Sequence, residues 1–179
     1  MLQYRHRGCL VRLVRQRRSI TADVKFFSAW RAGHRMYRVC LVMCSSEKAL
    51  SATKAADLYL SSRFQADRLY AEHNFDCWYI LSGKYGLLSP STVIETYDMD
   101  LQRLSDAERA AWGQHVIKTL CQQVPEGEVS IEIRGEPSYY QPLRTALLAF
   151  GFVEAINSRE GCIRYTRLGS LPLLSLDKQ

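Results

Sequence analysis

The chain has 179 residues, 47% hydrophobic and 23% charged, which is the size and composition of one globular domain with a buried core. It contains no run of about 18 apolar residues, so the sequence predicts no membrane-spanning helix. The formal net charge is +6, but residues 1–35 carry +8 and leave −2 on residues 36–179. The overall charge therefore gives no support for a basic nucleic-acid-binding face on the folded part.

The basic leader, residues 1–35, is not a secretion signal, because Arg12 and Arg15 interrupt its apolar residues. Three interpretations remain: an organellar transit-like segment, a basic arm that contacts phosphates, or translated sequence upstream of a start at Met36. The last is favoured, since Met36 directly precedes the first clear strand pattern and nothing earlier has a consistent period. We predict that the leader is disordered or outside the native domain, and that residues 36–179 form a single α/β domain.

Cysteine and histidine spacing gives no sign of a metal centre. The six cysteines form no C-x-x-C motif, and three of them lie in apolar runs, where cysteine behaves as a small hydrophobic residue. The four histidines lack the spacing that tetrahedral zinc requires. The sequence thus predicts reduced thiols in a cytoplasmic protein, with no metal and no cofactor.

Two continuous apolar runs, residues 39–44 and 77–81, are typical of strands that are covered on both faces. A helix is predicted between them, because apolar residues recur at helical spacing. The predicted sheet-facing stripe consists of Ala66, Leu69, Tyr70 and His73. A strand, a helix and a second strand form a crossover unit, so the two strands should pair in parallel.

The next helix is predicted from a capping box at Ser105 and Glu108, in which each residue bonds the free backbone N–H of the other. This helix should end near Cys121. Residues 129–133 then alternate between apolar and polar, which favours a strand with one wetter face, nearer the edge of the sheet.

A further helix is predicted to open at Pro142 and close at Gly151. Residues 152–153 and 163–165 are weaker strand candidates. The alternating order of strands and helices predicts a three-layer α/β/α sandwich with a mostly parallel central sheet.

Polar residues follow three of the predicted strands, and ligands in open α/β sheets bind beyond the carboxyl ends of the strands. These residues are Cys44, Ser45, Ser46, Glu47 and Lys48 after the first strand, Ser82, Gly83, Lys84, Tyr85 and Gly86 after the second, and Arg134, Gly135, Glu136 and Tyr139 after the third. Each group includes a cation, which predicts an anionic ligand such as a nucleotide or a nucleic-acid phosphate. The alternatives are solvated loop lysines and, for the two glycines of the second group, a plain tight turn. Neither a P-loop nor a dinucleotide-binding motif is present.

The long connection 83–102 is predicted to be functional, since loops of this length are functional or disordered. Its acids Glu95, Asp98 and Asp100 lie around Tyr97. A carboxylate beside aromatic rings could polarise water or stabilise a cationic transition state. The alternative for Asp98 is a turn in which the side chain bonds its own backbone.

Several aromatic residues near the strand ends could stack on a base, and Tyr85 and Tyr97 are the candidates outside a strand. Trp78 and Tyr79 lie inside a strand run and are better explained as core residues. Cys44 could be a nucleophile, but no histidine is near it in the sequence, so a buried thiol is favoured.

The segments Ala55–Tyr59, Trp78–Pro90 and Ile94–Asp98, with Phe64, resemble a bacterial and phage family, domain-of-unknown-function family 6884, which is similar at a distance to the peroxide-stress protein YaaA. The resemblance covers residues 37–150.

The chain matches the family pattern at some positions and departs from it at others. Cys44 and Lys48 match the cysteine and lysine that follow the family's first strand. Gly83 stands where alanine is usual, and residues 134–139 match a later A-G-x-x-Y segment only approximately.

The resemblance implies a fold akin to uracil-DNA-glycosylase-like domains and a role near nucleic acids in stress response or phage defence. The leading hypothesis is an enzyme that acts on a nucleobase or nucleotide, such as an N-glycosidase acting on modified DNA. Its predicted site residues are Lys48, Lys84 and Arg134 for phosphate, Tyr85 or Tyr97 for the base, and Asp98 for the cationic sugar or water. Among them, Asp98, Lys84 and Tyr97 are the predicted catalytic residues. The alternatives are a non-catalytic nucleotide or DNA binder that protects against stress, and DNA binding by the leader alone.

Overall fold

The computed structural model describes residues 3–6, 9–12, 36–155 and 161–167. Of the leader, it describes an antiparallel pair of strands, β1 (Gln3–His6) and β2 (Cys9–Arg12). The rest of the leader lies outside the described residues, and so does most of the prediction made for it.

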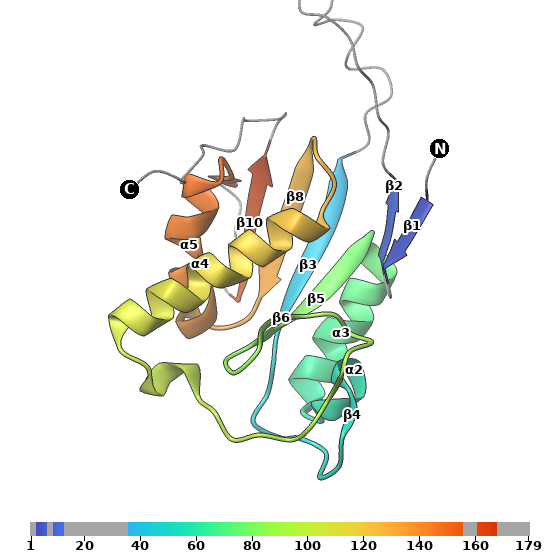
Figure 1. Cartoon of the computed structure of the whole chain (residues 1–179), viewed down its shortest axis with the longest axis vertical. Coiled ribbons are helices and arrows are strands. Elements are labelled where there is room, and N and C mark those ends of the chain that lie inside the picture. Colours follow the sequence, from blue (N-terminus) through green and yellow to red (C-terminus); the bar gives the residue numbers. More distant parts are fainter. Residues whose placement is uncertain (1–2, 7–8, 13–35, 156–160, 168–179) are drawn as a thin grey trace, which may run out of the picture.

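The described part of residues 36–179 alternates between strands and helices, as the sequence predicted (Figure 1). The elements are β3 (Tyr37–Met43), β4 (Thr53–Lys54), α2 (Ala55–Leu58), α3 (Ser62–Asn74), β5 (Cys77–Ser82), β6 (Gly86–Leu88), β7 (Val93–Ile94), the 3-10 helix η1 (Leu101–Arg103), α4 (Asp106–Gln123), β8 (Val129–Arg134), α5 (Pro137–Ala149), β9 (Val153–Glu154) and β10 (Cys162–Arg167).

The main sheet is mixed, and its strand order among the described residues is β6-β5-β3-β8-β10-β9. β3 pairs in parallel with β5 and with β8, whereas the other neighbouring pairs are antiparallel. The prediction of a mostly parallel sheet is therefore wrong. Parallel pairing needs a crossover of a dozen or more residues, and the connections from β5 to β6 and from β9 to β10 are too short to provide one.

Helices lie on both sides of the parallel centre of the sheet, with α3 on one side and α4 and α5 on the other (Figure 1). Val39, Cys40, Leu41 and Val42 in β3 are each 0% exposed. A strand that is buried at every position must be covered on both faces, which confirms the prediction for this run.

The capping box that was predicted for α4 is present. Ser105 Oγ accepts from the Glu108 N–H at 3.3 Å, and Glu108 Oε2 accepts from the Ser105 N–H at 2.8 Å. The helix ends at Gln123, close to the predicted Cys121. No helix in the described residues, α4 included, is both long and apolar enough to cross a membrane.

The predicted sheet-facing stripe of α3 is right only for Tyr70, which is partly buried and lies against Arg134 of β8. Leu69 is 55% exposed, and the buried apolar residues of the helix are Phe64 and Ala71. The polar residues Asp67 and Arg68 lie on the inner side, where each is bonded to groups on other elements. Polar residues on the packed face disguise the helical period, so the apolar pattern predicted the wrong face.

The predicted start of α5 is also wrong, because the helix begins at Pro137 and Pro142 lies inside it. A proline is well suited to the first helical position, where its missing N–H would have had no partner. Around Pro142 the helices α4 and α5 pack very closely: a Cβ on Gly113 would lie 2.3 Å from the Pro142 carbonyl oxygen. The predicted end at Gly151 is confirmed, since Gly151 has a φ of 77° directly after the helix.

The prediction of reduced thiols holds for four cysteines of the described residues and fails for one. Cys40, Cys44, Cys121 and Cys162 are free. Cys77 is disulfide-bonded.

Candidate functional site

The carboxyl ends of β3 and β5 lie next to each other, as parallel pairing requires. Met43 is opposite Leu81, and the Cys44 N–H donates to the Leu81 carbonyl at 3.0 Å. Loops that leave these two strands therefore begin at the same edge of the sheet, which is where the sequence placed the ligand site.

Two lysines, one from each of these loops, meet at the same tyrosine ring. Lys48 Nζ lies 4.6 Å and Lys84 Nζ 5.5 Å from the centroid of the Tyr97 ring. Tyr85 packs edge to face against Tyr97 at 5.2 Å. We call Lys48, Lys84, Tyr85 and Tyr97 the lysine–tyrosine cluster.

Neither ammonium of this cluster forms an ion pair within the described part of the chain. Lys48 Nζ donates to the Ser46 carbonyl at 3.3 Å, and Lys84 is exposed. A cation–π contact contributes only about 0.5–2 kcal/mol and leaves the N–H groups able to donate. Both lysines can therefore still bind an anion.

Hydroxyl groups beneath the cluster fasten the long connection to β5. Tyr97 Oη lies 2.7 Å from Ser82 Oγ and 2.9 Å from Tyr59 Oη. Burial raises the pKa of Tyr59 to about 12 and also raises the pKa of Tyr97. Both phenols are thus neutral at pH 7 and act as hydrogen-bonding groups, not as charges.

The helices α4 and α5 support the same strand ends. Cys44 Sγ and Tyr139 Oη lie 3.2 Å apart and are buried, and the Tyr139 ring packs edge to face on Trp112 at 5.9 Å. Trp112 Nε1 donates to the Ser82 carbonyl at 3.0 Å. The indole N–H of Trp112 is a signal in the sequence that this residue needs a polar partner when it is buried. The hydrogen-bonding partner of Cys44 is a phenol that burial keeps neutral by raising its pKa, an arrangement that fits the buried-thiol interpretation.

The two glycines of the turn after β5 differ. Gly86 has a φ of 70°, so an L side chain would be strained there. Gly83 does not have a positive φ, and a Cβ on it would meet Leu101 and Met99 at 3.5–3.7 Å, an ordinary contact distance. Alanine, the usual family residue at this position, would therefore fit.

Arg134, at the end of β8, does not join the cluster. Its Nε donates to Asp67 Oδ1 at 2.6 Å and its Nη1 to Glu132 Oε1 at 3.1 Å, and its guanidinium lies 4.2 Å from the Tyr70 ring centroid. Residues two apart in a strand point to the same face, so Arg134 and Glu132 both point toward α3. The predicted phosphate-binding cation is neutralised by carboxylates instead.

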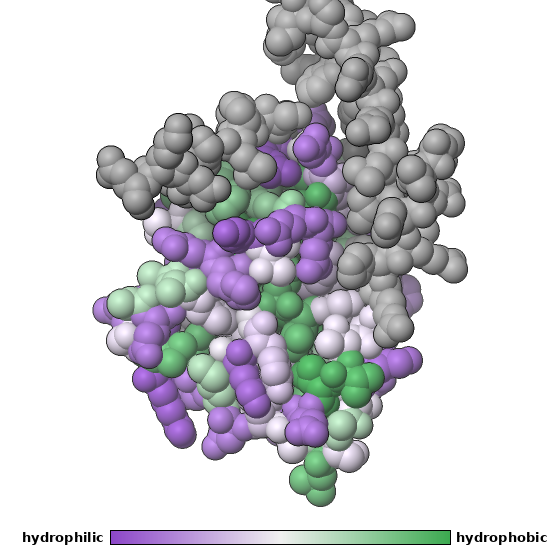
Figure 2. Space-filling model, viewed as in Figure 1, coloured by the Kyte–Doolittle hydropathy of each residue, from purple (hydrophilic) through white to green (hydrophobic). Residues whose placement is uncertain are grey.

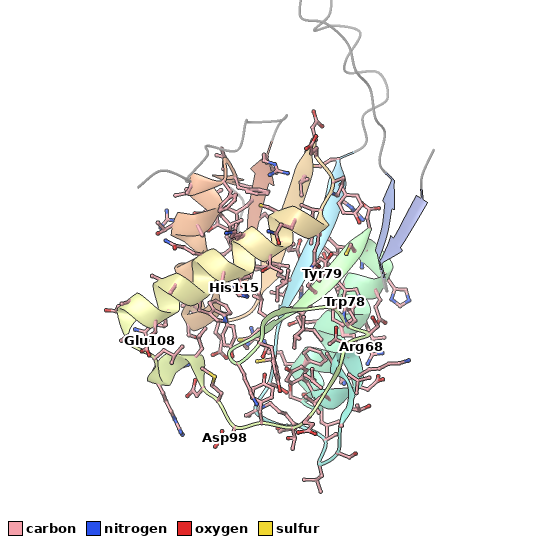
Figure 3. All side chains as sticks on the ribbon, viewed as in Figure 1. Arg68, Trp78, Tyr79, Asp98, Glu108 and His115 are labelled. Carbon is pink, nitrogen blue, oxygen red and sulfur yellow. The ribbon has the colours of Figure 1, made fainter. Side chains whose placement is uncertain are left out.

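Asp98, the predicted catalytic acid, also lies outside the cluster. Its side chain is exposed and forms no hydrogen bond or ion pair with any residue that the structure describes, and Figure 3 places it at the outer edge of the loop. Tyr97 points inward, and successive side chains of an extended segment point in opposite directions. The backbone-bonding role considered for Asp98 belongs to Asp100, whose Oδ1 accepts from the Gln102 N–H at 2.9 Å.

Three further residues considered from the sequence, Ser45, Trp78 and Tyr79, have structural roles in their loop or strand. Ser45 Oγ donates to the Glu47 carbonyl at 3.0 Å within its own loop. Trp78 and Tyr79 lie within β5 (Figure 3), and Tyr79 is only 4% exposed, as expected of a core residue. No group of three or more histidine, cysteine or acidic side chains in the described residues is placed to hold a metal ion.

Two adjoining hollows of about 280 and 550 Å³ lie elsewhere, between the N-terminal halves of α4 and α5. Arg109, Ser138 and Gln141 line both, and none of the cluster residues lines either. Arg109 is already bonded to the Gln102 and Leu104 carbonyls and to Asp106. The unpaired lysines of the cluster and these hollows therefore lie in different places. Because an anion needs free positive charge, the cluster is the better candidate for the binding site.

Comparison with known proteins supports the resemblance at the family level. Residues 39–156 match a family of unknown function, DUF6884. The chain belongs to this family. It is also 37% identical over 71 residues to the uncharacterized protein YfjM of Bacillus subtilis (strain 168), a match that covers 36% of this chain and 47% of YfjM. The matched part of this DUF6884 chain thus spans about half the length of that relative. No solved structure matches the chain significantly.

Proposed function

We propose that the lysine–tyrosine cluster binds the phosphate of a nucleotide or of a nucleic acid. The observation that carries the proposal is that two ammonium groups without ion-pair partners among the described residues both contact the Tyr97 ring, at the carboxyl ends of two parallel strands. Charge-assisted hydrogen bonds from such groups are the strong contacts of phosphate sites.

An aromatic surface beside the lysines favours a nucleotide over inorganic phosphate. Tyr85 is partly exposed and lies next to Lys84, whose Nζ is 5.0 Å from its ring centroid. Base stacking on an aromatic ring contributes about 1–3 kcal/mol per base and tolerates any sequence. We assign the phosphate to the lysines and the base to Tyr85.

Binding has more support than N-glycosidic cleavage. That reaction draws on a carboxylate that stabilises a cationic sugar or orients water, and Asp98 points away from the cluster. Catalytic roles for Lys84 and Tyr97, which lie in the cluster, stay predictions. Incubation with modified and unmodified DNA, followed by mass spectrometry of released bases, tests them directly.

The distant relation to YaaA, the uracil-DNA-glycosylase-like fold and the role in stress or phage defence belong to the same proposal. Their support is the resemblance of residues 78–98 to the family pattern. Survival of bacteria with and without the gene under peroxide and under phage infection tests the cellular role.

Binding is tested by fluorescence anisotropy with a fluorescein-labelled nucleotide and a labelled oligonucleotide. Lys48→Gln and Lys84→Gln should each weaken binding about tenfold, because hydrogen bonds to charged groups contribute about 1.5–3 kcal/mol. Lys118→Gln, at an exposed position of α4, is the matched control and should bind normally. Binding should also weaken as salt increases. Unchanged affinity in both cluster variants at low salt would rule the site out.

A further inference from the structure

The loop between β3 and β4 carries a leucine whose side chain is almost fully exposed. Leu50 is 96% exposed, two residues after Lys48. The base of this loop is closed by backbone pairing of Lys48 with Tyr59 and by a bond from the Ala49 N–H to the Leu58 carbonyl at 2.8 Å. Leu50 is therefore exposed on a loop whose base is held in place by hydrogen bonds.

Two further exposed apolar residues lie on segments bonded to this loop. Leu60, whose N–H donates to the Glu47 carbonyl at 3.0 Å, is 52% exposed. Val93, on β7, is 64% exposed and pairs with Lys54 of β4. This loop is the lowest part of the fold in Figure 1, and Figure 2 shows apolar surface at the same end. A single exposed apolar residue needs no explanation. Leu50 and Leu60 both adjoin the Lys48–Tyr59 backbone pair, so together they offer apolar surface beside that lysine.

We infer that the ligand of the cluster is an oligonucleotide strand, and that Leu50 packs against a base next to the nucleotide held by Lys48. This inference rests on the proposed function. Two residues of chain span at most about 7 Å, and a stacked strand advances about 3.4 Å per nucleotide. Leu50 is thus within reach of a neighbouring nucleotide, and a free mononucleotide would leave it uncovered.

The chemistry of the loop fits this role. Apolar side chains that insert beside bases are an established mode of nucleic-acid contact. The neighbours of Leu50, namely Ala49, Ser51 and Ala52, are small and leave room for a base to approach. Glu47 and Glu95 are exposed on the adjoining segments and repel phosphate, so the contacted strand should be short.

The test compares Leu50→Ser with the wild-type chain by anisotropy, using a labelled mononucleotide and labelled single strands of two, four and eight nucleotides. Leu50→Ser should weaken octamer binding about tenfold, as expected for lost burial of a leucine side chain. It should leave mononucleotide binding unchanged. Leu148→Ser is the matched control, because Leu148 is 51% exposed on α5 and should affect neither ligand.

The outcomes separate the two proposals. If Lys48→Gln and Lys84→Gln weaken both ligands while Leu50→Ser binds the octamer like wild type, the oligonucleotide inference is wrong and the proposed function stands. Equal weakening of the mononucleotide by Leu50→Ser would also overturn the inference. If the lysine variants change nothing, both proposals fail.

Discussion

Cations at the ends of neighbouring parallel strands have opposite surroundings in this protein. Lys48 and Lys84, after β3 and β5, lie over a tyrosine ring and have no carboxylate partner in the described residues. Arg134, after β8, lies between Asp67 and Glu132, whose side chains are 13% and 3% exposed. The first region leaves its charge without an ion-pair partner among the described residues, and the second uses its charge to hold α3 against the sheet.

This difference shows that a cation at a strand end is not by itself a site. Arg134 belongs to a network that continues to Arg164, which donates to the other oxygen of Glu132 at 2.8 Å. A buried carboxylate requires such partners, because an unpaired charge in the interior is costly. The arginine is therefore committed to Glu132, whereas the part of the chain that the structure describes has no buried carboxylate beneath the lysines.

The largest effect should come from breaking the arginine network. Arg134→Met should lower the free energy of unfolding by about 3 kcal/mol, because it leaves Asp67 and Glu132 short of a partner. Urea denaturation measures the loss, and oligonucleotide affinity should stay unchanged. Arg164→Met removes a half-exposed partner and should cost less. Weakened binding with normal stability in Arg134→Met would place Arg134 in the ligand site after all.

Alkaline pH should affect the two regions differently, because a tyrosine titrates in the first and the arginine of the second stays charged. The pKa of Tyr59 is raised by burial from 10 to about 12, so its contribution to stability is complete below pH 10 and is lost as the pH rises toward 12. We expect a loss on the order of 2 kcal/mol from this group by pH 12. Arg134 keeps its charge over this range. Burial lowers the pKa of Arg134, but its bonds to Asp67 and Glu132 raise it by more, so its pKa lies above the ordinary value.

Urea midpoints between pH 8 and pH 12 measure this alkaline loss, with tyrosinate absorbance recorded in parallel. Other buried tyrosines, including Tyr79, have a raised pKa and add to the decline. Tyr59→Phe should therefore make the decline shallower without abolishing it. A decline that is just as steep in Tyr59→Phe would show that this phenol is not the group responsible.

The smallest effect is expected at Asp98. Asp98→Asn should change neither oligonucleotide affinity nor stability by more than about 0.5 kcal/mol, since the side chain is exposed and unbonded in the described structure. Anisotropy and urea denaturation measure the two quantities. If turnover is found, and Asp98→Asn abolishes it while binding stays normal, the catalytic role predicted from the sequence would be restored.

Much of the architecture could be predicted from local patterns. The buried run of β3, the capping box at Ser105 and the stop at Gly151 depend on neighbours in the chain, and the structure agrees with each. The inner face of α3 could not be predicted, because Asp67 and Arg68 are drawn inward by partners on other elements. The direction of β10 depends on its pairing with β8, which is set by the whole sheet.

The amino-acid sequence by itself determined that Lys48 and Lys84 follow two buried strands, and helical crossovers then require those strand ends to lie at one edge. Only the tertiary structure decided which charged groups find partners there. The ion pairs of Arg134 depend on the distance between α3 and β8. That distance cannot be deduced from the spacing of residues along the chain. The same is true of Asp98, whose direction depends on Tyr97 being bonded inward to Ser82 and Tyr59.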